Sequence, residues 1–586
     1  MKNIEKIVFL FLLLFCSYSC TTKAQDDNVY ENQLLQNKPY KSEYPQDYFI
    51  SPLKIPLSLA GTFAELRGSH FHSGIDIRTN ERTGYAVIAP ADGYISRIKV
   101  QAFGGGKNLY IVHPNGYTTV YMHLKSYAGK IEQFVQDYQY KNECYTFDYS
   151  FKKPSIYVHQ GDTIAFSGES GAAQGPHLHF EIRDTKTERP INPLLFGLNI
   201  PDTTAPNILN FAITPNNNGI IEGSPSTKII SLADTNFKEG DTIYCLGDMS
   251  FSILAYDASY NSSLRNGVWK TELFVDTTLI FSHHIETFSF NDYGFVDATI
   301  NYPLYITTGK RYLHSKKMAG CFLPFNYYLN DGILNVQTDS IYKISWRVTD
   351  LNNNSTVYSF YLKGIYDVNM QLNGRLSLND RLFEYSKANI YKAQDGSLFS
   401  FPQGSLYEDI VFSAYKTKGK YSDIHHIHTV YEPVRKKFFV KIKPYRIDTT
   451  LKTKYLIVKI NSKGYKSSAG GKLVGNYVRT TTGDFGTFTV WIDTVAPKIK
   501  NVNFKNNKRL SKHQKTLKVK ITDNLSGINT YKAYLNGKWV LMEYDGKHAM
   551  LTYFIDDKLK DGKNVLEIAV TDAKNNIKKA EYTIIK

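Results

Sequence analysis

Side chains that can bind a metal ion or move a proton gather in short segments of this 586-residue chain, and these segments have the spacing of β-strands. In the first, His72 and Asp76 are four residues apart, with isoleucines at positions 75 and 77. Successive side chains on a strand point to opposite faces. The imidazole and the carboxylate are therefore expected on one face, with apolar residues behind them, as half of a metal site.

Two further segments carry histidines in the same kind of pattern. His177, His179 and Glu181 alternate with apolar residues, so their side chains are expected on one face of a second strand. His123 follows Tyr121 at a spacing of two and is expected on the same face of a third strand. Two imidazoles on one strand face can both approach a metal-bound group.

The chemistry that these residues favour is metal-assisted hydrolysis. Mixed nitrogen and oxygen ligands suit zinc, although other transition metals accept them too. The chain has no His-Glu-x-x-His motif, so no glutamate is placed as the base of a helical zinc site. Histidine, with a pKa near ~6.5, is then the candidate group for proton transfer at neutral pH.

The order of these motifs resembles the lysostaphin-type zinc metallopeptidases, a peptidoglycan endopeptidase family with a duplicated hybrid motif. The resemblance rests on a His-x-x-x-Asp motif, a Tyr-x-His-Leu motif and a final His-x-His motif, and it covers about residues 55–198. These motifs and the surrounding segments that match lie at residues 72–76, 89–93, 115–119, 121–124, 161–162, 170–176 and 177–179.

The resemblance implies a role for each of five residues. Zn²⁺ is expected on His72, Asp76 and His179, and an open fourth position would take the water that attacks the peptide bond. His123 and His177 are expected to be the catalytic residues that do not bind the metal. One would orient or deprotonate the water and the other would stabilise the developing oxyanion; the sequence leaves open which does which.

The expected function is that of a secreted zinc metalloendopeptidase that hydrolyses peptide bonds in bacterial peptidoglycan cross-links or stems. A non-hydrolytic peptidase-like scaffold, which binds the cell wall or activates another wall hydrolase, is the alternative. Such scaffolds typically lose metal ligands, whereas all five residues are present here. An enzyme that acts on protein substrates outside the cell is a third possibility.

The N-terminus has the pattern of a signal peptide. Lys2 and Lys6 precede a short apolar run, and small and polar residues lead to Cys20. Lipidation of Cys20 would make the protein a lipoprotein, whereas cleavage after Ala24 would release it in soluble form. We therefore expect an exported protein in the cell envelope: periplasmic, anchored to the outer membrane, or secreted. The lipid on Cys20 is the only membrane contact expected.

The net charge and the cysteines indicate which kinds of partner and which cysteine roles to expect. The formal net charge is +16, which suits an acidic polymer such as the cell wall, although Lys and Arg are spread along the whole chain. No nucleic-acid partner is expected. The mature cysteines Cys144, Cys245 and Cys321 are widely spaced and suggest neither a disulfide framework nor a structural zinc site.

An all-β fold is expected, in which an antiparallel peptidase domain precedes several β-sandwiches. Asp-Thr-x-Ala-Pro occurs at 202–206 and again at 493–497, and Val-Thr-Asp occurs at 348–350 and 570–572. These repeats resemble bacterial immunoglobulin-like domains, whose surfaces could bind protein partners. The expected division is a signal peptide (1–20), a tether (21–47), the zinc peptidase domain (48–200), an immunoglobulin-like sandwich (201–365), a β-rich domain of uncertain type (366–492) and a second immunoglobulin-like sandwich (493–586).

One segment departs from the family pattern. The stretch between His123 and His177 is long, and its extra part, about 133–155, is rich in Tyr and Phe. Aromatic residues favour strands, so a decorated surface hairpin is the preferred interpretation. A wall or lid of the substrate groove is the alternative, which would affect substrate choice.

Overall fold

The computed structural model describes residues 44–198, 200–233, 236–258, 265–366 and 381–586. The expected signal peptide, Cys20 and the tether up to residue 43 lie outside these residues. The all-β prediction is confirmed: strands dominate, and in the described ranges only two strand pairings, β16 (Thr242–Tyr256) with β23 (Ser355–Gly364) and β37 (Lys508–Arg509) with β44 (Ile577–Ile585), are parallel. None of the helices in the described part of the chain has the length and apolar character needed to cross a membrane.

The first β region, residues 44–198, contains a nine-stranded sheet and a three-stranded sheet. The order along the large sheet is β1-β2-β11-β6-β5-β4-β8, with β12 beside β11 and β9 beside β4, and the small sheet is β3-β10-β7. The strands are β1 (Leu59–Gly61), β2 (Ile75–Arg78), β3 (Ala86–Ile88), β4 (Gly93–Val100), β5 (Lys107–Val112), β6 (Tyr117–Met122), β7 (Ser126–Tyr127), β8 (Phe147–Ser150), β9 (Tyr157–Val158), β10 (Thr163–Phe166), β11 (His177–Asp184) and β12 (Pro190–Ile191).

Strand alternation builds the core of this region. Leu178, Phe180 and Ile182 on β11 are completely buried in the main hydrophobic cluster, together with Ile75 and Ile77 from β2. Residues at the alternate positions of both strands therefore face the other side of the sheet. The apolar positions thus fix which face of the sheet carries the histidines.

The second β region, described between residues 200 and 366, is an eleven-stranded assembly with three short helical segments, one of which is the 3₁₀ segment η3 (Asn330–Gly332). Its order is β15-β13-β16-β23-β22-β17-β18-β20, and β14, β19 and β21 pair with β16. The remaining elements are β13 (Asn207–Pro215), β14 (Ile220–Ile221), β15 (Lys228–Ser231), β17 (Lys270–Val275), β18 (Thr278–His284), the 3₁₀ segment η2 (Phe290–Ala298), α3 (Tyr302–Thr308), β19 (Leu313–His314), β20 (Asn326–Tyr328), β21 (Ile333–Val336) and β22 (Ile341–Thr349).

The third β region, residues 381–492, pairs two five-stranded sheets with a two-stranded sheet. The sheets are β25-β26-β30-β34-β33, β28-β29-β35-β31-β32 and β24-β27. Their strands are β24 (Arg381–Phe383), β25 (Asn389–Lys392), β26 (Leu398–Phe401), β27 (Ile410–Phe412), β28 (Ala414–Thr417), β29 (Ile424–Ile427), β30 (Phe438–Ile442), β31 (Tyr455–Ile460), β32 (Lys466–Ser468), β33 (Lys472–Val474), β34 (Tyr477–Thr482) and β35 (Gly486–Ile492).

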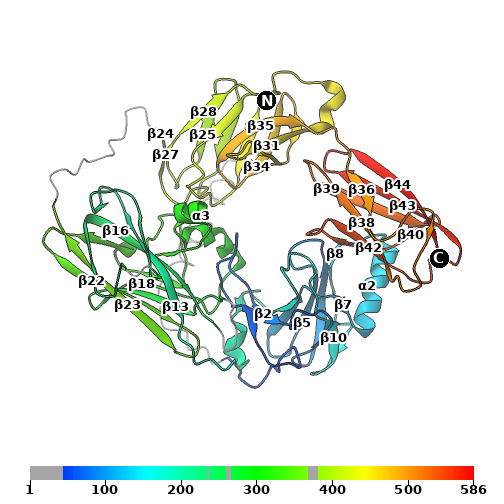
Figure 1. Ribbon diagram of the computed structural model, residues 1–586, viewed down its shortest axis with the longest axis horizontal. Helices are drawn as coiled ribbons and strands as arrows, with labels where there is room; N and C mark the ends of the chain where they lie inside the picture. Colours follow the sequence, from blue (N-terminus) through cyan, green and yellow to red (C-terminus); the bar gives the residue numbers. More distant parts are fainter. Residues whose placement is uncertain (1–43, 199, 234–235, 259–264, 367–380) are drawn as a thin grey trace, which may run out of the picture.

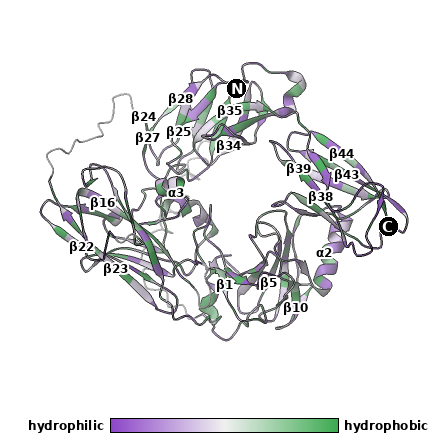
Figure 2. Cartoon of the chain, in the orientation of Figure 1, coloured by the Kyte–Doolittle hydropathy of each residue, from purple (hydrophilic) through white to green (hydrophobic). Residues whose placement is uncertain are grey.

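The fourth β region, residues 493–586, has two sheets, β36-β38-β42-β41 and β37-β44-β43-β39-β40. Buried and exposed residues alternate along β43 (Lys563–Asp572), and the same alternation appears as green and purple bands in Figure 2. This is the pattern of strands with one face on a core. The other strands are β36 (Lys498–Asn501), β38 (Thr516–Thr522), β39 (Ile528–Leu535), β40 (Lys538–Trp539), β41 (Glu543–Asp545) and β42 (Met550–Phe554).

The preferred interpretation of the aromatic segment at 133–155 was wrong. Residues Gly129–Lys141 form the helix α2, and β8 follows and pairs with β4 at the end of the large sheet. Ile131, Val135 and Gln139 are buried at a spacing of four, so one helix face packs on the core. That packing outweighs the strand preference of the aromatic residues.

The four β regions follow a closed path, in which the fourth returns to the first (Figure 1). Tyr140 on α2 meets Trp539 with ring centroids 5.2 Å apart. Lys107 Nζ lies 2.7 Å from Glu543 Oε1, although Lys107 is only 8% exposed. Contacts between residues more than 390 positions apart therefore hold the C-terminal region against the first.

We expect Glu543→Lys to separate the fourth region from the first. The substitution places two ammonium groups in contact and leaves the buried charge of Lys107 without its partner, a change that costs about 3–5 kcal/mol for buried pairs. Small-angle scattering should show a larger radius of gyration. Glu581→Lys, at an exposed position of the same region, is the matched control. An equal expansion in both variants would contradict the role given to this ion pair.

Candidate metal centre

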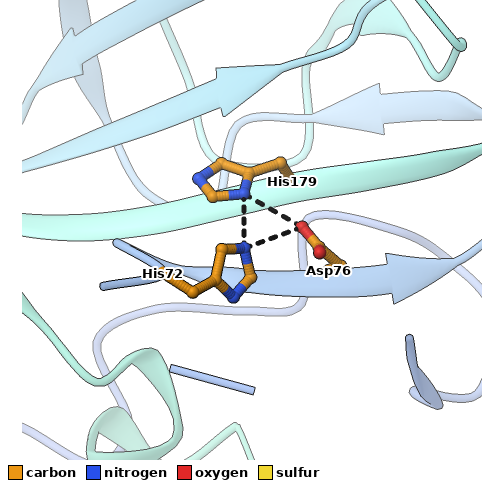
Figure 3. Close-up of side chains that lie close together, drawn as sticks. All are labelled: His72, Asp76 and His179. Carbon is orange, nitrogen blue, oxygen red and sulfur yellow. Dashed lines mark hydrogen bonds and ion pairs between the residues drawn. The ribbon is translucent and has the colours of Figure 1, made fainter. Parts of the chain in front are cut away.

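Three side chains converge on the polar side of the large sheet. Asp76 on β2 is directly opposite His179 on β11 in the antiparallel register, and His72 precedes β2 by three residues. His72 Nε2, Asp76 Oδ1 and His179 Nδ1 lie 3.0 Å from one another, as the dashed lines in Figure 3 mark. All three residues are buried, with exposed fractions between 5% and 8%.

Hydrogen bonds behind the triangle orient both rings. His72 Nδ1 donates to the carbonyl oxygen of Thr62 at 2.6 Å, which leaves the Nε2 lone pair free. His179 Nε2 donates to Glu181 Oε1 at 2.9 Å, which leaves the Nδ1 lone pair free. Arg67 Nη2 donates to the outer oxygen of Asp76 at 3.1 Å. The three inward atoms are therefore all electron-pair donors.

Glu181 is the centre of this supporting layer. It is completely buried, and it accepts hydrogen bonds from Ser73 and Arg183 as well as from His179. Burial alone would raise its pKa, but the charge of Arg183 and the bond from His179 lower the pKa to about 2. A charged acceptor thus fixes the tautomer of His179 and increases its basicity, as carboxylates behind metal-bound histidines do.

The pKa values of Asp76 and His179 are shifted because these side chains are buried in contact with each other. Burial opposes charge on Asp76, yet the neighbouring His72 and His179 hold its pKa well below the ordinary value. Burial likewise lowers the pKa of His179, but the bonds to Asp76 and Glu181 outweigh it and raise the pKa to about 9. The opposite directions of the two shifts show that the negative charge of the carboxylate and a positive charge beside it stabilise each other.

These residues fit a metal ion. Two imidazole nitrogens and one carboxylate oxygen form a set that zinc accepts, and the 3.0 Å edges are close to the ~3.3 Å ligand separation of a tetrahedral site with ~2.0–2.1 Å bonds. Three protein ligands leave a position for water or substrate.

Two more histidines lie beside the triangle. The His123 and His177 rings are 4.8 Å apart, and His177 Nε2 is 3.6 Å from Asp76 Oδ1. His123 Nδ1 donates to the Ser170 carbonyl oxygen at 2.9 Å, and His177 Nδ1 donates to the Gly175 carbonyl oxygen at 2.8 Å. Each ring therefore keeps an unprotonated Nε2. Burial lowers the pKa of both, to about 3 for His123.

His123 stands at the turn after β6, not on the strand as the sequence pattern predicts. Its φ of 61° lies in the left-handed region, and its amide donates to the carbonyl of Gly105 at 2.7 Å. The 168–171 loop packs against this turn so closely that a Cβ on Gly168 would lie 2.6 Å from the His123 carbonyl oxygen. Two interlocked loops thus position this ring.

The fourth β region touches the second of these loops. Lys547 Nζ lies 2.9 Å from Glu169 Oε1 and donates to the Ala173 carbonyl oxygen at 2.6 Å. These contacts flank Ser170, whose carbonyl holds His123. The C-terminal region therefore borders the site.

The structure brings together all five residues that the sequence singles out: His72, Asp76, His123, His177 and His179. Sequence reasoning gave no role to Glu181 or Arg67, and nothing in the local pattern pointed to the Thr62 and Ser170 carbonyls. For Glu181 there was a signal, because it shares a strand face with His179 at a spacing of two. The carbonyl partners come from loops and carry no such signal.

Glu181→Gln should weaken metal binding by about 10–100-fold, the usual cost of losing a partner of a metal ligand. The amide keeps the shape but not the charge that holds His179. It also leaves the buried Arg183 short of a partner, so the melting temperature should fall. Metal titration of the purified protein checks the affinity. Glu188→Gln removes an exposed carboxylate, 3.4 Å from the same arginine, and should change neither property. Equal affinities in both variants would exclude the supporting role.

Comparisons with known proteins identify families for two parts of the chain. Residues 70–140 match the model of peptidase family M23, and residues 380–493 match that of the Zu5-like domain. The chain therefore carries an M23 peptidase domain, whose matched segment includes His72, Asp76 and His123. His177 and His179 lie beyond that segment.

Among curated relatives, an uncharacterized metalloprotease of Haemophilus influenzae is 34% identical over 127 residues, which are 22% of this chain and 21% of the relative. The DD-carboxypeptidase/endopeptidase Mpg of Neisseria meningitidis is 31% identical over 141 residues, 24% of this chain and 26% of the relative. The chain thus spans about a quarter of the length of these relatives. The catalytic domain of lysostaphin from Staphylococcus simulans is 23% identical with a TM-score of 0.18, over 24% of this chain and 90% of that one.

Proposed function

We propose that the protein is an exported zinc metalloendopeptidase that hydrolyses peptide bonds in the cross-links or stems of bacterial peptidoglycan. The observation that carries the proposal is the triangle of His72 Nε2, Asp76 Oδ1 and His179 Nδ1, with two unprotonated imidazole nitrogens beside it. A binding scaffold needs no such nitrogens.

Zinc would be held by the three inward atoms of the triangle. When bound, it supplies Lewis acidity, which lowers the pKa of water to ~7 and polarises a carbonyl group. The chain's own contribution is to orient those atoms and hold them in place. The Thr62 carbonyl and Glu181 hold the two rings with their lone pairs inward, and burial excludes competing water.

His123 and His177 would transfer the proton from the attacking water to the leaving amine. Each ring donates Nδ1–H to a backbone carbonyl, so its Nε2 can accept a proton from the attacking water and pass it to the leaving amine. With Nδ1–H engaged by a carbonyl, each ring presents an unprotonated Nε2, which is the state that a proton acceptor needs. The backbone bonds stop the rings from turning away.

Three observations support peptidoglycan as the substrate. A relative that is 31% identical over 141 residues bears the name DD-carboxypeptidase/endopeptidase. The net charge of +16 favours an anionic polymer. The signal-peptide pattern would deliver the protein to the envelope, with Cys20 as a lipid anchor. The regions beyond residue 200 would then bind protein partners or the wall.

Incubation of the purified protein with peptidoglycan, followed by mass analysis of the released fragments, tests the proposal. New amino termini within stem or bridge peptides, formed only by the metal-loaded protein, are expected. Retention on the wall without cleavage would favour the scaffold alternative. Cleavage of denatured casein but not of peptidoglycan would favour a protein substrate.

A further inference from the structure

A second group of acidic residues lies where the first β region passes into the second. Asp202 is in the connection that leads to β13, Asp257 directly follows β16, and Asp350 directly follows β22. One oxygen from each carboxylate lies within 4.8 Å of the others. No ion pair joins any of the three to a cationic side chain among the residues that the structure describes.

An unpartnered amide faces the same group. Asn266 is 3% exposed, and neither its Oδ1 nor its Nδ2 has a hydrogen-bond partner within the described ranges. Its backbone exchanges both hydrogen bonds with Asp257, at 2.9 and 2.8 Å. Residues opposed in this way have their side chains on one face. Asn266 and the three aspartates also line one pocket of about 190 Å³.

The fourth β region contains the same arrangement with one difference. Asp493, Asp523 and Asp572 form its acidic cluster. Asn576 donates its backbone N–H to Oδ1 of Asp572 at 2.8 Å and its Nδ2–H to Oδ2 at 2.7 Å. Asn354 donates to the two oxygens of Asp350 in the same way and at the same distances. The two clusters are therefore built on one local plan.

The difference is a charged side chain beside the cluster. Two residues beyond Asp572 stands Lys574, which is 6% exposed; its backbone N–H donates to Asp572 Oδ1 at 2.7 Å, and its Nζ donates to the Gly471 carbonyl oxygen at 2.5 Å. Two residues beyond Asp350 stands Asn352, a neutral side chain that lines the pocket. A buried lysine thus stands beside the C-terminal cluster, whereas the corresponding position beside the first cluster is a neutral asparagine. Burial and the charges of Asp202 and Asp350 raise the pKa of Asp257 to about 7.

We propose that the three carboxylates of the first cluster, together with the side-chain oxygen of Asn266, bind a calcium ion. The donor set consists of oxygen atoms, which hard divalent cations prefer. Ca²⁺ takes 6–8 oxygen ligands in flexible geometry and accepts several carboxylates, whereas Mg²⁺ is usually held by one or two. The ion would fasten the connection at Asp202 to the ends of two strands of the second region. This inference is independent of the proposed peptidase activity.

The test is calcium titration of the zinc-loaded full chain, followed by calorimetry and by terbium luminescence excited through Trp269, which lines the same pocket. About one Ca²⁺ per chain is expected, with a Kd near the ~10⁻⁴–10⁻³ M of extracellular modules. Asn352→Lys, which places an ammonium group beside the three carboxylates, should weaken binding by about tenfold or more. Asp257→Asn should do the same.

The controls separate this site from the others. Asp523→Asn, in the C-terminal cluster, and His72→Ala, in the metal centre, should both leave calcium affinity at the first cluster unchanged. Calcium should raise the melting temperature of the wild type but not of the Asn352→Lys variant, which must itself stay folded without calcium. No saturable binding, or equal binding by the wild type and the Asn352→Lys variant, would overturn the proposal.

Discussion

Replacement of His72 by alanine is expected to remove both bound zinc and hydrolysis. His72 supplies one corner of the 3.0 Å triangle, and the two remaining donors leave a site that water can enter. Loss of a metal ligand must lower metal affinity by more than the ~10–100-fold that follows loss of a hydrogen-bond partner of a ligand. Activity should therefore fall by at least ~10³-fold. Elemental analysis of the purified variant and digestion of peptidoglycan measure the two effects.

A matched control is available in the same region. His159→Ala removes a histidine whose side chain is 82% exposed, and it should keep both zinc and activity. Added zinc should not restore the His72→Ala variant at concentrations that saturate the wild type. Full hydrolysis by the metal-free variant would refute the proposed chemistry.

Replacement of His123 or His177 by alanine should separate metal binding from turnover. Neither ring belongs to the triangle, so zinc content should stay at the wild-type level. General acid–base catalysis contributes about 10²–10⁴-fold, so kcat should fall by that amount. Steady-state kinetics on a soluble cross-linked peptide, with zinc content measured on the same samples, checks both halves of the prediction.

The double variant adds a further criterion. If the two histidines act on one proton-transfer sequence, removal of both should cost much less than the product of the single losses. Loss of zinc in either single variant would instead give that histidine a place among the ligands. A fully active single variant would remove it from the mechanism.

Strand alternation was sufficient to predict part of the site. It correctly places Asp76 and His179 on one sheet face, because β2 and β11 carry buried apolar residues at the intervening positions. It is wrong for His123, which stands in a turn with a positive φ. A period of two applies only while the chain stays extended, and β6 ends one residue earlier, at Met122.

Other features depended on contacts that no local pattern encodes. The Thr62 carbonyl that orients His72 and the Ser170 carbonyl that orients His123 belong to loops, whose backbone groups carry no sequence signal. The helix α2 was missed because its aromatic residues favour strands, whereas its buried face is fixed by packing. The all-β character was predictable, because it depends on composition and turn residues along the whole chain.

The return of the fourth β region to the first has a consequence for how strongly the two adhere. Three ion pairs and a few aromatic contacts would form a weak complex between separate proteins. Within one chain, the second and third regions connect the partners, so the contact is intramolecular and the effective concentration of the two partners is raised. A protein truncated before residue 493 should therefore bind the isolated fourth region only when that fragment is added at a concentration that matches this effective concentration. The covalent link between the regions is thus what keeps this face of the first region covered.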